Sequence, residues 1–377
     1  MIYRGKSFRE ILALFQKNKM RKNQKGGETV VNLPDLTPIL PWYGKHRRDL
    51  PWRHTRDPYR IWVSEIMLQQ TRVEAVIPYY ERFLDALPTV AALATAPEAQ
   101  ILKLWEGLGY YSRVRNMQKA ARTVMEAHNG VFPTTFEGIL SLCGIGEYTA
   151  GAIASFAFDL PHPAVDGNVL RVAARLLAFE DDILAPTSKK QLTAAVAAAQ
   201  PKDHAADFNQ AMIELGATVC LPNGVPKCEE CPLCAICRAR AEGKETALPI
   251  RRKPAPRKKE HRTVLILRCG DKVALRQRPE SGLLAGLFEP PVLDGIHSEA
   301  ELLQFFTLRG ITPLRVAPLG DAKHIFTHLE WHMVGFEVII PEDGVDFLPS
   351  ELFFAPREEI DRRYALPTAY RAYRPFM

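Results

Sequence analysis

The sequence has no apolar run long enough to form a membrane-spanning helix. Such a helix needs about 20 consecutive apolar residues, whereas the 47% apolar and 24% charged residues of this 377-residue chain are interspersed. The basic N-terminal segment also has no small-residue cleavage site of the kind that follows a secretion signal. These absences predict a cytoplasmic protein with no membrane partner.

Cysteine is scarce outside one short segment. Five of the seven cysteines lie within residues 220–237, and in a chain without a secretion signal such crowding indicates metal binding and not disulfides. A C-x7-C-x2-C-x5-C array is formed by Cys220, Cys228, Cys231 and Cys237. Four thiolates of this kind could hold an iron–sulfur cluster or zinc. Cys234 leaves the ligand set open, because residues 228, 231, 234 and 237 are also evenly spaced.

The length and one proline-rich segment predict two domains. Residues 1–32 are basic and polar, so we expect a partly disordered N-terminal extension, with a short basic amphipathic helix as the alternative. Residues 33–246 carry mainly helical patterns. Residues 247–262 are rich in proline and charge with little to bury, which is typical of a linker. Residues 263–377 alternate as strands and end in a helix, which predicts an α+β domain.

The net charge of +6 is small for this length, but basic residues cluster at 46–48 and 251–262. Such clusters suit a polyanion, although they can equally be solvated faces. The segment GLGYYSRVRN at 107–116 adds glycines, tyrosines and arginines, as a loop that faces nucleic acid would need. An interhelix turn with its tyrosines in the core is the alternative.

A glycine hairpin, an apolar helix and a carboxylate follow one another at residues 142–172. Gly144 and Gly146 permit close backbone approach, and a helix starting near Glu147 would aim unpaired N–H groups at that place. A phosphate would suit it, although an ordinary helix–turn–helix corner has the same pattern. Asp166 precedes a helix predicted over 168–179, where it could be part of a site or only an N-cap.

A second carboxylate, Glu65, lies among apolar residues at helical spacing. Burial would raise its pKa and favour the protonated acid, which can donate a proton near neutral pH. The alternative is a glutamate that borders the apolar stripe or pairs with an arginine.

These motifs together resemble the MutY family of adenine DNA glycosylases, in the helix-hairpin-helix superfamily that includes endonuclease III. The resemblance runs from about Leu36 to Arg240 through LPWR, SEIMLQQT, GLGYYSRVRN, LCGIGEYTAGAI, VDGNV, FNQAMIELGATVC and the cysteine array. It implies a mainly α catalytic domain with a [4Fe-4S] cluster, and a C-terminal α+β Nudix-like domain that recognises 8-oxoguanine. The implied partner is double-stranded DNA with adenine opposite 8-oxoguanine or guanine, bound by a nucleoid-associated monomer.

The resemblance also implies roles for single residues. Glu65 would protonate adenine at N7, and Asp166 would stabilise the oxocarbenium sugar. Tyr148 stands where endonuclease III has its lyase lysine, which implies a glycosylase that forms no Schiff base. The implied cluster ligands are Cys220, Cys228, Cys231 and Cys237. The implied residues for binding DNA and adenine are Arg48, Leu50, Trp52, Arg53, Gln70, Tyr110, Gly144, Gly146, Gln210, Phe326, Thr327 and His328.

The chain departs from the family pattern in three places. Cys143 replaces a common proline in the hairpin, the first cysteine gap is x7 where the family has x6, and Thr327 replaces a serine. No intact Nudix hydrolase box is visible, so the second domain would bind nucleotides without hydrolysing them. The competing functions are a bifunctional glycosylase/AP lyase like endonuclease III, a non-catalytic DNA-binding module, and a nucleotide pyrophosphatase.

Overall fold

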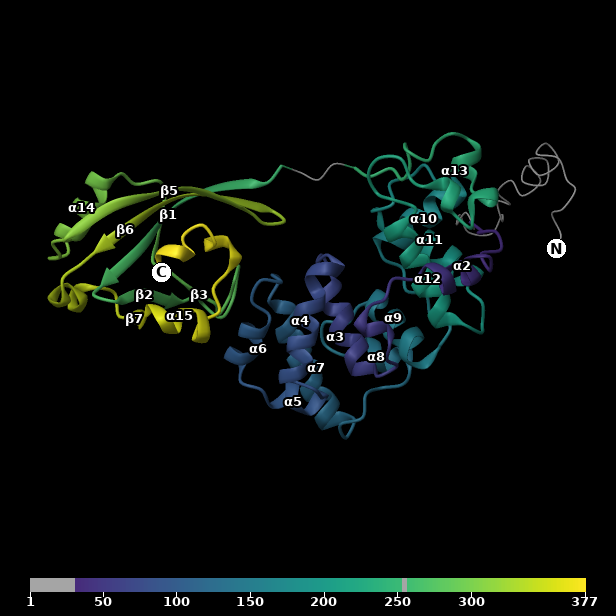
Figure 1. Cartoon of the computed structure of the whole chain (residues 1–377), viewed down its shortest axis with the longest axis horizontal. Coiled ribbons are helices and arrows are strands. Elements are labelled where there is room, and N and C mark those ends of the chain that lie inside the picture. Colours follow the sequence, from purple (N-terminus) through teal and green to yellow (C-terminus); the bar gives the residue numbers. More distant parts are fainter. Residues whose placement is uncertain (1–30, 253–255) are drawn as a thin grey trace, which may run out of the picture. The chain divides into compact units, whose positions relative to one another are not determined.

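The computed structural model describes residues 31–252 and 256–377 (Figure 1). The expected extension at 1–32 lies almost wholly outside the described residues. The chain forms two compact units, which are Met1–Glu65 with Phe132–Lys253, and Ile66–Val131 with Pro254–Met377. The predicted helical region, 33–246, therefore contributes to both units. Within the described ranges, no helix is long and apolar enough to cross a membrane.

The first unit is helical throughout its described residues. The apolar helix predicted after the glycine hairpin is α9, and the helix predicted after Asp166 begins one residue earlier and ends two residues earlier than expected. Helix α12 packs against both α9 and α10. The helices of this unit are α2 (Ile39–His46), η1 (Pro51–Arg53), the first part of α3 (Pro58–Leu68), α8 (Phe136–Leu140), α9 (Glu147–Phe158), α10 (Gly167–Leu177), α11 (Pro186–Ala199), α12 (Ala205–Thr218), η2 (Cys228–Glu230), η3 (Cys234–Ile236) and α13 (Arg238–Ala241).

Helices α9 and α10 are buried for different reasons. Helix α9 is apolar on all sides and buries most of its length, as expected of a core helix. Helix α10 alternates apolar and basic residues, yet its two arginines, Arg171 and Arg175, are also buried. A buried arginine needs acceptors for its hydrogen bonds, and these come from the loop that follows α12.

The second unit combines helices with a mixed sheet. Its helices before the sheet are α4 (Val73–Ala86), α5 (Val90–Thr95), α6 (Glu98–Leu104) and α7 (Ser112–Ala127). The strands are β1 (Lys258–Cys269), β2 (Lys272–Gln277), β3 (Phe288–Glu289), β4 (Val292–Asp294), β5 (Arg315–Ile325), β6 (Leu329–Ile339) and β7 (Leu352–Pro356). They pair in the order β3-β2-β1-β6-β5, with β4 on β1 and β7 on β2.

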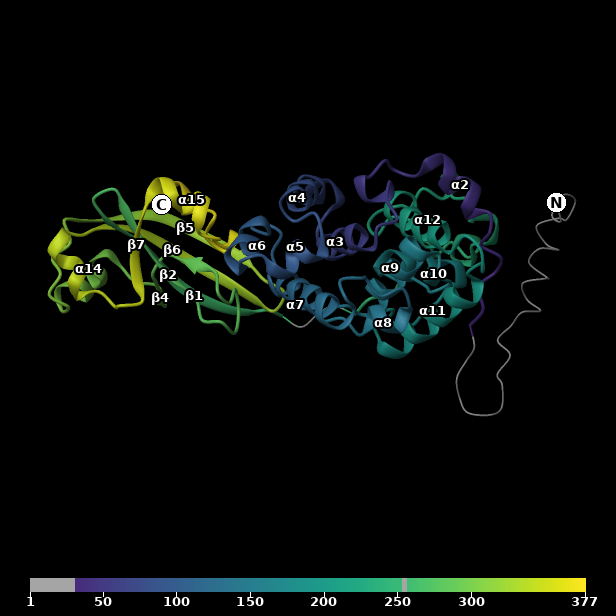
Figure 2. The same cartoon turned by 90° about the horizontal axis from the view of Figure 1, so that it is seen from below.

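The long strands β1, β5 and β6 lie side by side (Figures 1 and 2). β1 and β6 are parallel, whereas β5 and β6 form an antiparallel hairpin. Helix α14 (Glu299–Thr307) supplies Leu302 and Phe306 to one core of the sheet. The C-terminal segment with α15 (Arg357–Arg363) supplies Ile360, Tyr370 and Tyr373 to the other. Aromatic and aliphatic residues thus cover both faces of the sheet.

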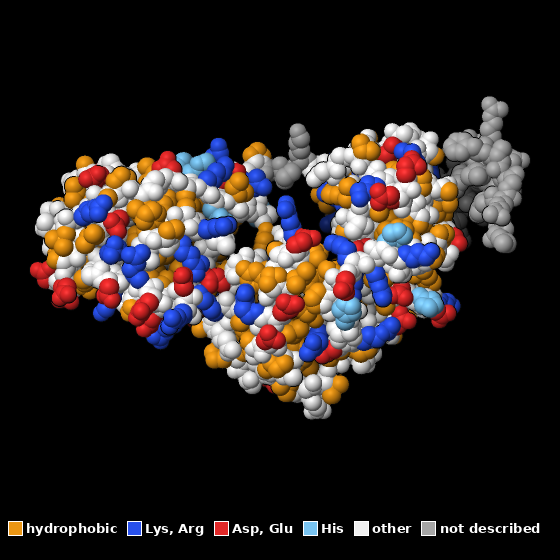
Figure 3. Space-filling view, in the orientation of Figure 1, with side chains coloured by type: hydrophobic (Ala, Val, Ile, Leu, Met, Phe, Trp, Pro, Cys, Tyr) orange, Lys and Arg blue, Asp and Glu red, His pale blue; other side chains and the backbone are white. Residues whose placement is uncertain are grey.

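The strands expected in residues 263–377 begin with β1 and β2, which flank a Cys-Gly-Asp turn, and a helix near the C-terminal end of this region is α15. β1, however, begins at Lys258, inside the predicted linker 247–262. The basic residues there belong to the strand because their backbone pairs with β6 from Leu329 onward. On the visible face of the sheet, basic side chains are interspersed with acidic ones (Figure 3).

Candidate active site and cysteine loop

The predicted acid, Glu65, is a buried carboxyl held by a tyrosine. It is 5% exposed on α3, and the Tyr148 hydroxyl, in the first turn of α9, donates to its Oε2 at 2.8 Å. Burial raises the pKa of Glu65 to about 7; the Tyr148 hydrogen bond opposes this, and the charge of Asp166 adds to it. Glu65 can therefore hold or release a proton near neutral pH.

The predicted partner carboxyl, Asp166, is the N-cap of α10. Its Oδ1 accepts hydrogen bonds from the backbone nitrogens of Asn168 and Val169, both at 2.8 Å. Its Oδ2 accepts a third from Asn168 Nδ2 at 2.7 Å. Burial raises the pKa of Asp166, while these hydrogen bonds and the nearby Arg171 lower it. Both carboxylate oxygens are thus fixed by the first turn of α10, which stabilises the ionised form.

The extended segment before Asp166, residues 161–165, is fixed by its contacts with helices α9 and α12. A Cβ added at Gly151 of α9 would come within 2.2 Å of the Pro163 oxygen, so only glycine allows this approach. Asn209 of α12 accepts from the Ala164 nitrogen at 3.1 Å and donates to the His162 oxygen at 2.8 Å. These contacts fix residues 161–165 and thereby hold Asp166 at the start of α10. Asn209 is a supporting residue that the sequence motifs did not single out.

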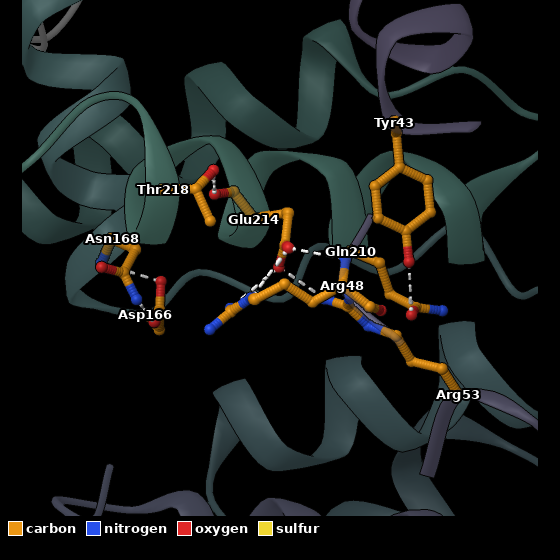
Figure 4. A network of polar contacts seen from close by, with 8 residues as sticks. All are labelled: Tyr43, Arg48, Arg53, Asp166, Asn168, Gln210, Glu214 and Thr218. Atoms are coloured by element: carbon orange, nitrogen blue, oxygen red, sulfur yellow. Dashed lines mark hydrogen bonds and ion pairs between the residues drawn. The ribbon is translucent and has the colours of Figure 1, made fainter. Parts of the chain in front are cut away.

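A further carboxylate, the buried Glu214 of α12, was also not singled out (Figure 4). Arg48 donates to it from Nε and NH2 at 2.8 and 2.9 Å, and Arg53 donates from NH2 at 2.8 Å. Burial alone raises the pKa of Glu214, but these arginines bring it down to about 2. Its side chain is 0% exposed, so the charge is retained because both arginines pair with it. Two arginines beside apolar residues at 48–53 were the signal for a buried acid.

The residues implied in the adenine pocket lie around α12. Gln210, one turn before Glu214, accepts a hydrogen bond from the Tyr43 hydroxyl at 2.8 Å (Figure 4). Leu50 and Trp52 are buried in the segment that also carries Arg48 and Arg53. The structure thus brings Arg48, Arg53 and Gln210 to one helix.

The glycine hairpin has the geometry expected from its sequence. Gly144 has φ 78°, a left-handed conformation that favours glycine. Gly146 is the N-cap of α9 and gives it no side-chain hydrogen bond. A Cβ at Gly146 would meet no atom within 4 Å, so the backbone there is open on that side. Cys143 is exposed beside it. The backbone N–H groups at this helix end suit an anion.

All five thiols of the cysteine loop are free, and they influence one another electrostatically. Burial raises the pKa of Cys231 to about 12 and that of Cys237 to about 11, and Cys220 raises both further. Arg175 NH1 donates to the Cys220 Sγ at 3.2 Å. Among the described residues, no three His, Cys, Asp or Glu side chains group closely enough to hold a single metal ion.

The second unit carries the other predicted DNA-binding residues. Tyr110 is 48% exposed, and its hydroxyl lies 2.7 Å from the Thr327 Oγ1. Phe326, Thr327 and His328 form the loop between β5 and β6, and Phe326 packs on Trp331. Gln70 and Tyr110 have φ of 60° and 49°. Such left-handed non-glycine residues store strain of a kind that is common at functional sites.

The arginines of GLGYYSRVRN do not face solvent as phosphate ligands would. Arg113 donates to backbone oxygens of Ile66, Gln69, Leu108 and Gly109. Arg115 donates to the Ala285 oxygen. Tyr111 is buried, whereas Tyr110 is exposed. The buried Tyr111 fits an interhelix turn, while the exposure of Tyr110 leaves contact with nucleic acid a prediction.

Comparisons with known proteins agree with this arrangement. Residues 63–198 match the HhH-GPD superfamily of base excision DNA repair proteins, and residues 262–374 match the NUDIX domain. The adenine DNA glycosylase of Rattus norvegicus is 37% identical over 352 residues, which cover 78% of this chain and 68% of the rat protein. That of Buchnera aphidicola subsp. Baizongia pistaciae is 36% identical over 304 residues, covering 80% of this chain and 85% of the other. The chain therefore belongs to the MutY-like adenine DNA glycosylase family of the HhH-GPD superfamily, with a C-terminal NUDIX domain.

Proposed function

We propose that this protein is a monofunctional DNA glycosylase that hydrolyses the N-glycosidic bond of adenine opposite 8-oxoguanine or guanine. The observation that carries the proposal is a pair of carboxyls: Glu65 is buried with a pKa of about 7, and Asp166 is part-buried and fixed by three hydrogen bonds. A protein that only binds DNA needs neither group. The names of the rat and Buchnera relatives support adenine as the base.

The reaction assigns a different task to each carboxyl. The target adenine must leave the base stack, because the glycosidic bond is not reachable inside the duplex. Glu65 gives its proton to adenine N7, and the C1′–N9 bond then breaks with its electron pair going to the base. Asp166 stabilises the positive charge that develops on the sugar. Water adds to C1′ and loses a proton, which leaves an abasic site.

Tyr148 supports a monofunctional enzyme. A lyase needs an amine that forms a Schiff base with the sugar, and a phenol cannot form one. The Tyr148 hydroxyl is instead engaged with Glu65. Its role would be to orient the Glu65 carboxyl. The endonuclease III-like glycosylase/AP lyase is the second candidate, and it would require an amine elsewhere in the chain.

The cysteine loop would hold a [4Fe-4S] cluster through Cys220, Cys228, Cys231 and Cys237. Three observations fit a group bound by thiolates: the thiols are free, they lie within electrostatic reach of one another, and Arg175 donates to the Cys220 Sγ. The cluster would cross-link Cys220, at the start of the loop after α12, to the three later cysteines of the same loop. Cys234 would remain outside the ligand set.

The sheet domain would distinguish the base opposite adenine. Thr327 and His328 offer a hydroxyl and an imidazole, which can hydrogen-bond the O8 and N7–H that separate 8-oxoguanine from guanine. Tyr110 and Gln70 would enter the duplex at the extruded pair, and the hairpin amides at Gly144 and Gly146 would bind a phosphate. The partner is double-stranded DNA, bound by a monomer in the cytoplasm at the nucleoid.

A single-turnover assay on four duplexes tests this function. We expect adenine release opposite 8-oxoguanine and guanine, and much slower release opposite cytosine and thymine. The product strand should break only after alkaline treatment. Strand breakage without that treatment would favour the bifunctional lyase, and no adenine release from any duplex would overturn the glycosylase assignment.

A further inference from the structure

In the second unit, polar contacts between the helices and the sheet domain lie along one stretch of the chain, residues 103–115. The covalent connection of the sheet domain runs instead through the linker from the first unit. We infer that Glu106 and Arg115 anchor the sheet domain on this helical segment and thereby set the position of Thr327 beside Tyr110. This inference rests on the proposed function, because it makes both residues positioning residues for recognition of the opposite base.

Glu106 is the centre of the first anchor. Its Oε1 accepts from Arg374 NH1 at 2.8 Å and from the Leu366 backbone nitrogen at 3.2 Å. Its neighbour Lys103 donates to the Tyr364 oxygen at 3.1 Å. The Glu106 side chain is 13% exposed, whereas that of Arg374 is 36% exposed. Losing the Glu106 carboxylate would leave the Leu366 amide without this acceptor and Arg374 with Asp361. Asp361 holds the other side of the Arg374 guanidinium.

Arg115 forms the second anchor, in the first turns of α7. Its NH2 donates to the Ala285 oxygen at 2.7 Å, and its Nε pairs with Glu98. The adjoining Gly286 has φ 65°, and a Cβ there would lie 2.5 Å from Arg115 NH2. Gly286, in the segment GLLAGLFEPP at residues 282–291, thus leaves space for the Arg115 side chain.

The segment between the two anchors is stiff. Trp105 Nε1 donates to the Gly109 oxygen at 3.1 Å, and Arg113 NH2 donates to the Leu108 and Gly109 oxygens, both at 3.1 Å. Gly107 has φ 105°, and a Cβ there would come within 2.1 Å of the Tyr79 hydroxyl. These contacts restrict the backbone conformation at 105–111. A displacement of Glu106 would therefore also displace Tyr110.

Tyr110 therefore lies four residues after one anchor and five before the other. The hydroxyl contact between Tyr110 and Thr327, at 2.7 Å, is the point at which this segment meets the β5–β6 loop. That contact is exposed, and an exposed hydroxyl pair cannot hold two elements in place by itself. The part-buried contacts of Glu106 and Arg115 hold the two elements together. They thereby fix the position of Thr327, which would contact the opposite base, relative to Tyr110, which would enter the duplex.

The test uses the full-length protein and compares Glu106→Ala, Arg115→Ala and Glu106→Gln with Glu126→Ala, an exposed glutamate of α7. Single-turnover excision is measured opposite 8-oxoguanine and opposite guanine, and deuterium exchange is measured at residues 364–368. We expect both alanine variants to lower the ratio of the two rates by about fivefold, the cost of one lost hydrogen bond. Excision opposite guanine should stay within about twofold of wild type.

Glu106→Gln keeps an acceptor oxygen, so its ratio should lie between those of wild type and Glu106→Ala. The Leu366 amide should exchange faster in Glu106→Ala, whereas Glu126→Ala should match wild type in both measurements. Unchanged deuterium exchange at 364–368 in Glu106→Ala would overturn the anchor. So would an unchanged ratio of the two excision rates in both alanine variants, if Thr327→Ala lowers that ratio. A wild-type enzyme that excises equally from both duplexes would overturn the proposed recognition of 8-oxoguanine, and the exchange measurement would still test the anchor.

Discussion

Arg171 donates from its Nε to the backbone oxygen of Cys220 at 2.7 Å. The same guanidinium donates from NH2 to Asn168 Oδ1 at 2.8 Å, and Asn168 in turn holds Asp166. One buried side chain thus links the cysteine loop to the residue that fixes a candidate catalytic carboxylate. The state of the loop and the orientation of Asp166 are therefore mechanically connected.

Replacing Arg171 should disturb both ends of this link. Arg171→Gln removes hydrogen bonds to Cys220, Asn168 and Gly216, and the remaining buried acceptors lose their partner. We expect a loss of about 3 kcal/mol in the free energy of unfolding, measured by urea denaturation. Excision should also fall at temperatures where the variant is still folded. Arg56→Gln, at an exposed position of the same unit, should change neither property.

Glu65→Gln should abolish adenine release while duplex binding survives. The amide keeps the shape of the side chain and can still accept from Tyr148, but it has no proton to give to adenine. Single-turnover kinetics measure the chemistry, and a gel-shift titration measures binding. An excision rate within tenfold of wild type would remove Glu65 from the role of acid.

The raised pKa of Glu65 predicts a pH-dependent difference in stability between wild type and Glu65→Gln. The folded pKa of about 7 lies above the unfolded value of 4.5, so the stability from the protonated carboxyl is present below pH 4.5 and is lost as pH rises to 7. Glu65→Gln has no such group. Its stability relative to wild type should increase over this window by about 3 kcal/mol, in unfolding measurements at several pH values. A difference that does not depend on pH would contradict the raised pKa.

The same carboxyl should control the rate. If Glu65 is the proton donor, excision by wild type falls about tenfold per pH unit above its pKa in the complex with DNA. A single-turnover rate that stays constant from pH 6 to pH 9 would contradict this role. Binding of the duplex, measured at the same pH values, separates the loss of chemistry from a loss of affinity.

Asp166 can be tested as a charge and as a cap with separate variants. Asn is as good an N-cap as Asp, so Asp166→Asn should keep the stability of α10 while it loses excision for lack of a negative charge. Asp166→Ala should lose excision and also about 1 kcal/mol of stability. If Asp166→Asn retained a near wild-type rate, Asp166 would serve only as the cap of α10.

The cluster ligands predict a clear pattern of colour. Purified protein should be brown, and serine at residue 220, 228, 231 or 237 should each remove the visible absorbance. Cys234→Ser should keep it. The reverse result for Cys220 and Cys234 would assign the evenly spaced cysteines as ligands. Zinc without iron in anaerobically purified protein would reject the iron–sulfur cluster.

The local features of the site follow from local physical rules. An acidic residue after an extended segment and before a helical pattern caps that helix, as Asp166 does for α10. An apolar stripe at helical spacing buries its face, so the sequence predicted Glu65 on or beside a buried stripe, and the structure shows that it is buried. The crowding of the cysteines and the glycine turn at Gly144 are likewise properties of short segments.

What the sequence could not provide are pairings between distant segments. Glu214 looks like any helical glutamate until the fold brings Arg48 and Arg53 to it from 161 to 166 residues away. Glu106 contacts Leu366 and Arg374 across 260 and 268 residues, and Arg113 turns inward to backbone oxygens although its sequence context suits a phosphate ligand. The sequence by itself determined which residues could carry charge, cap a helix or bind metal. Only the tertiary structure decided which charges are paired and how far each pKa moves, because these depend on burial and on neighbours that the chain order does not specify.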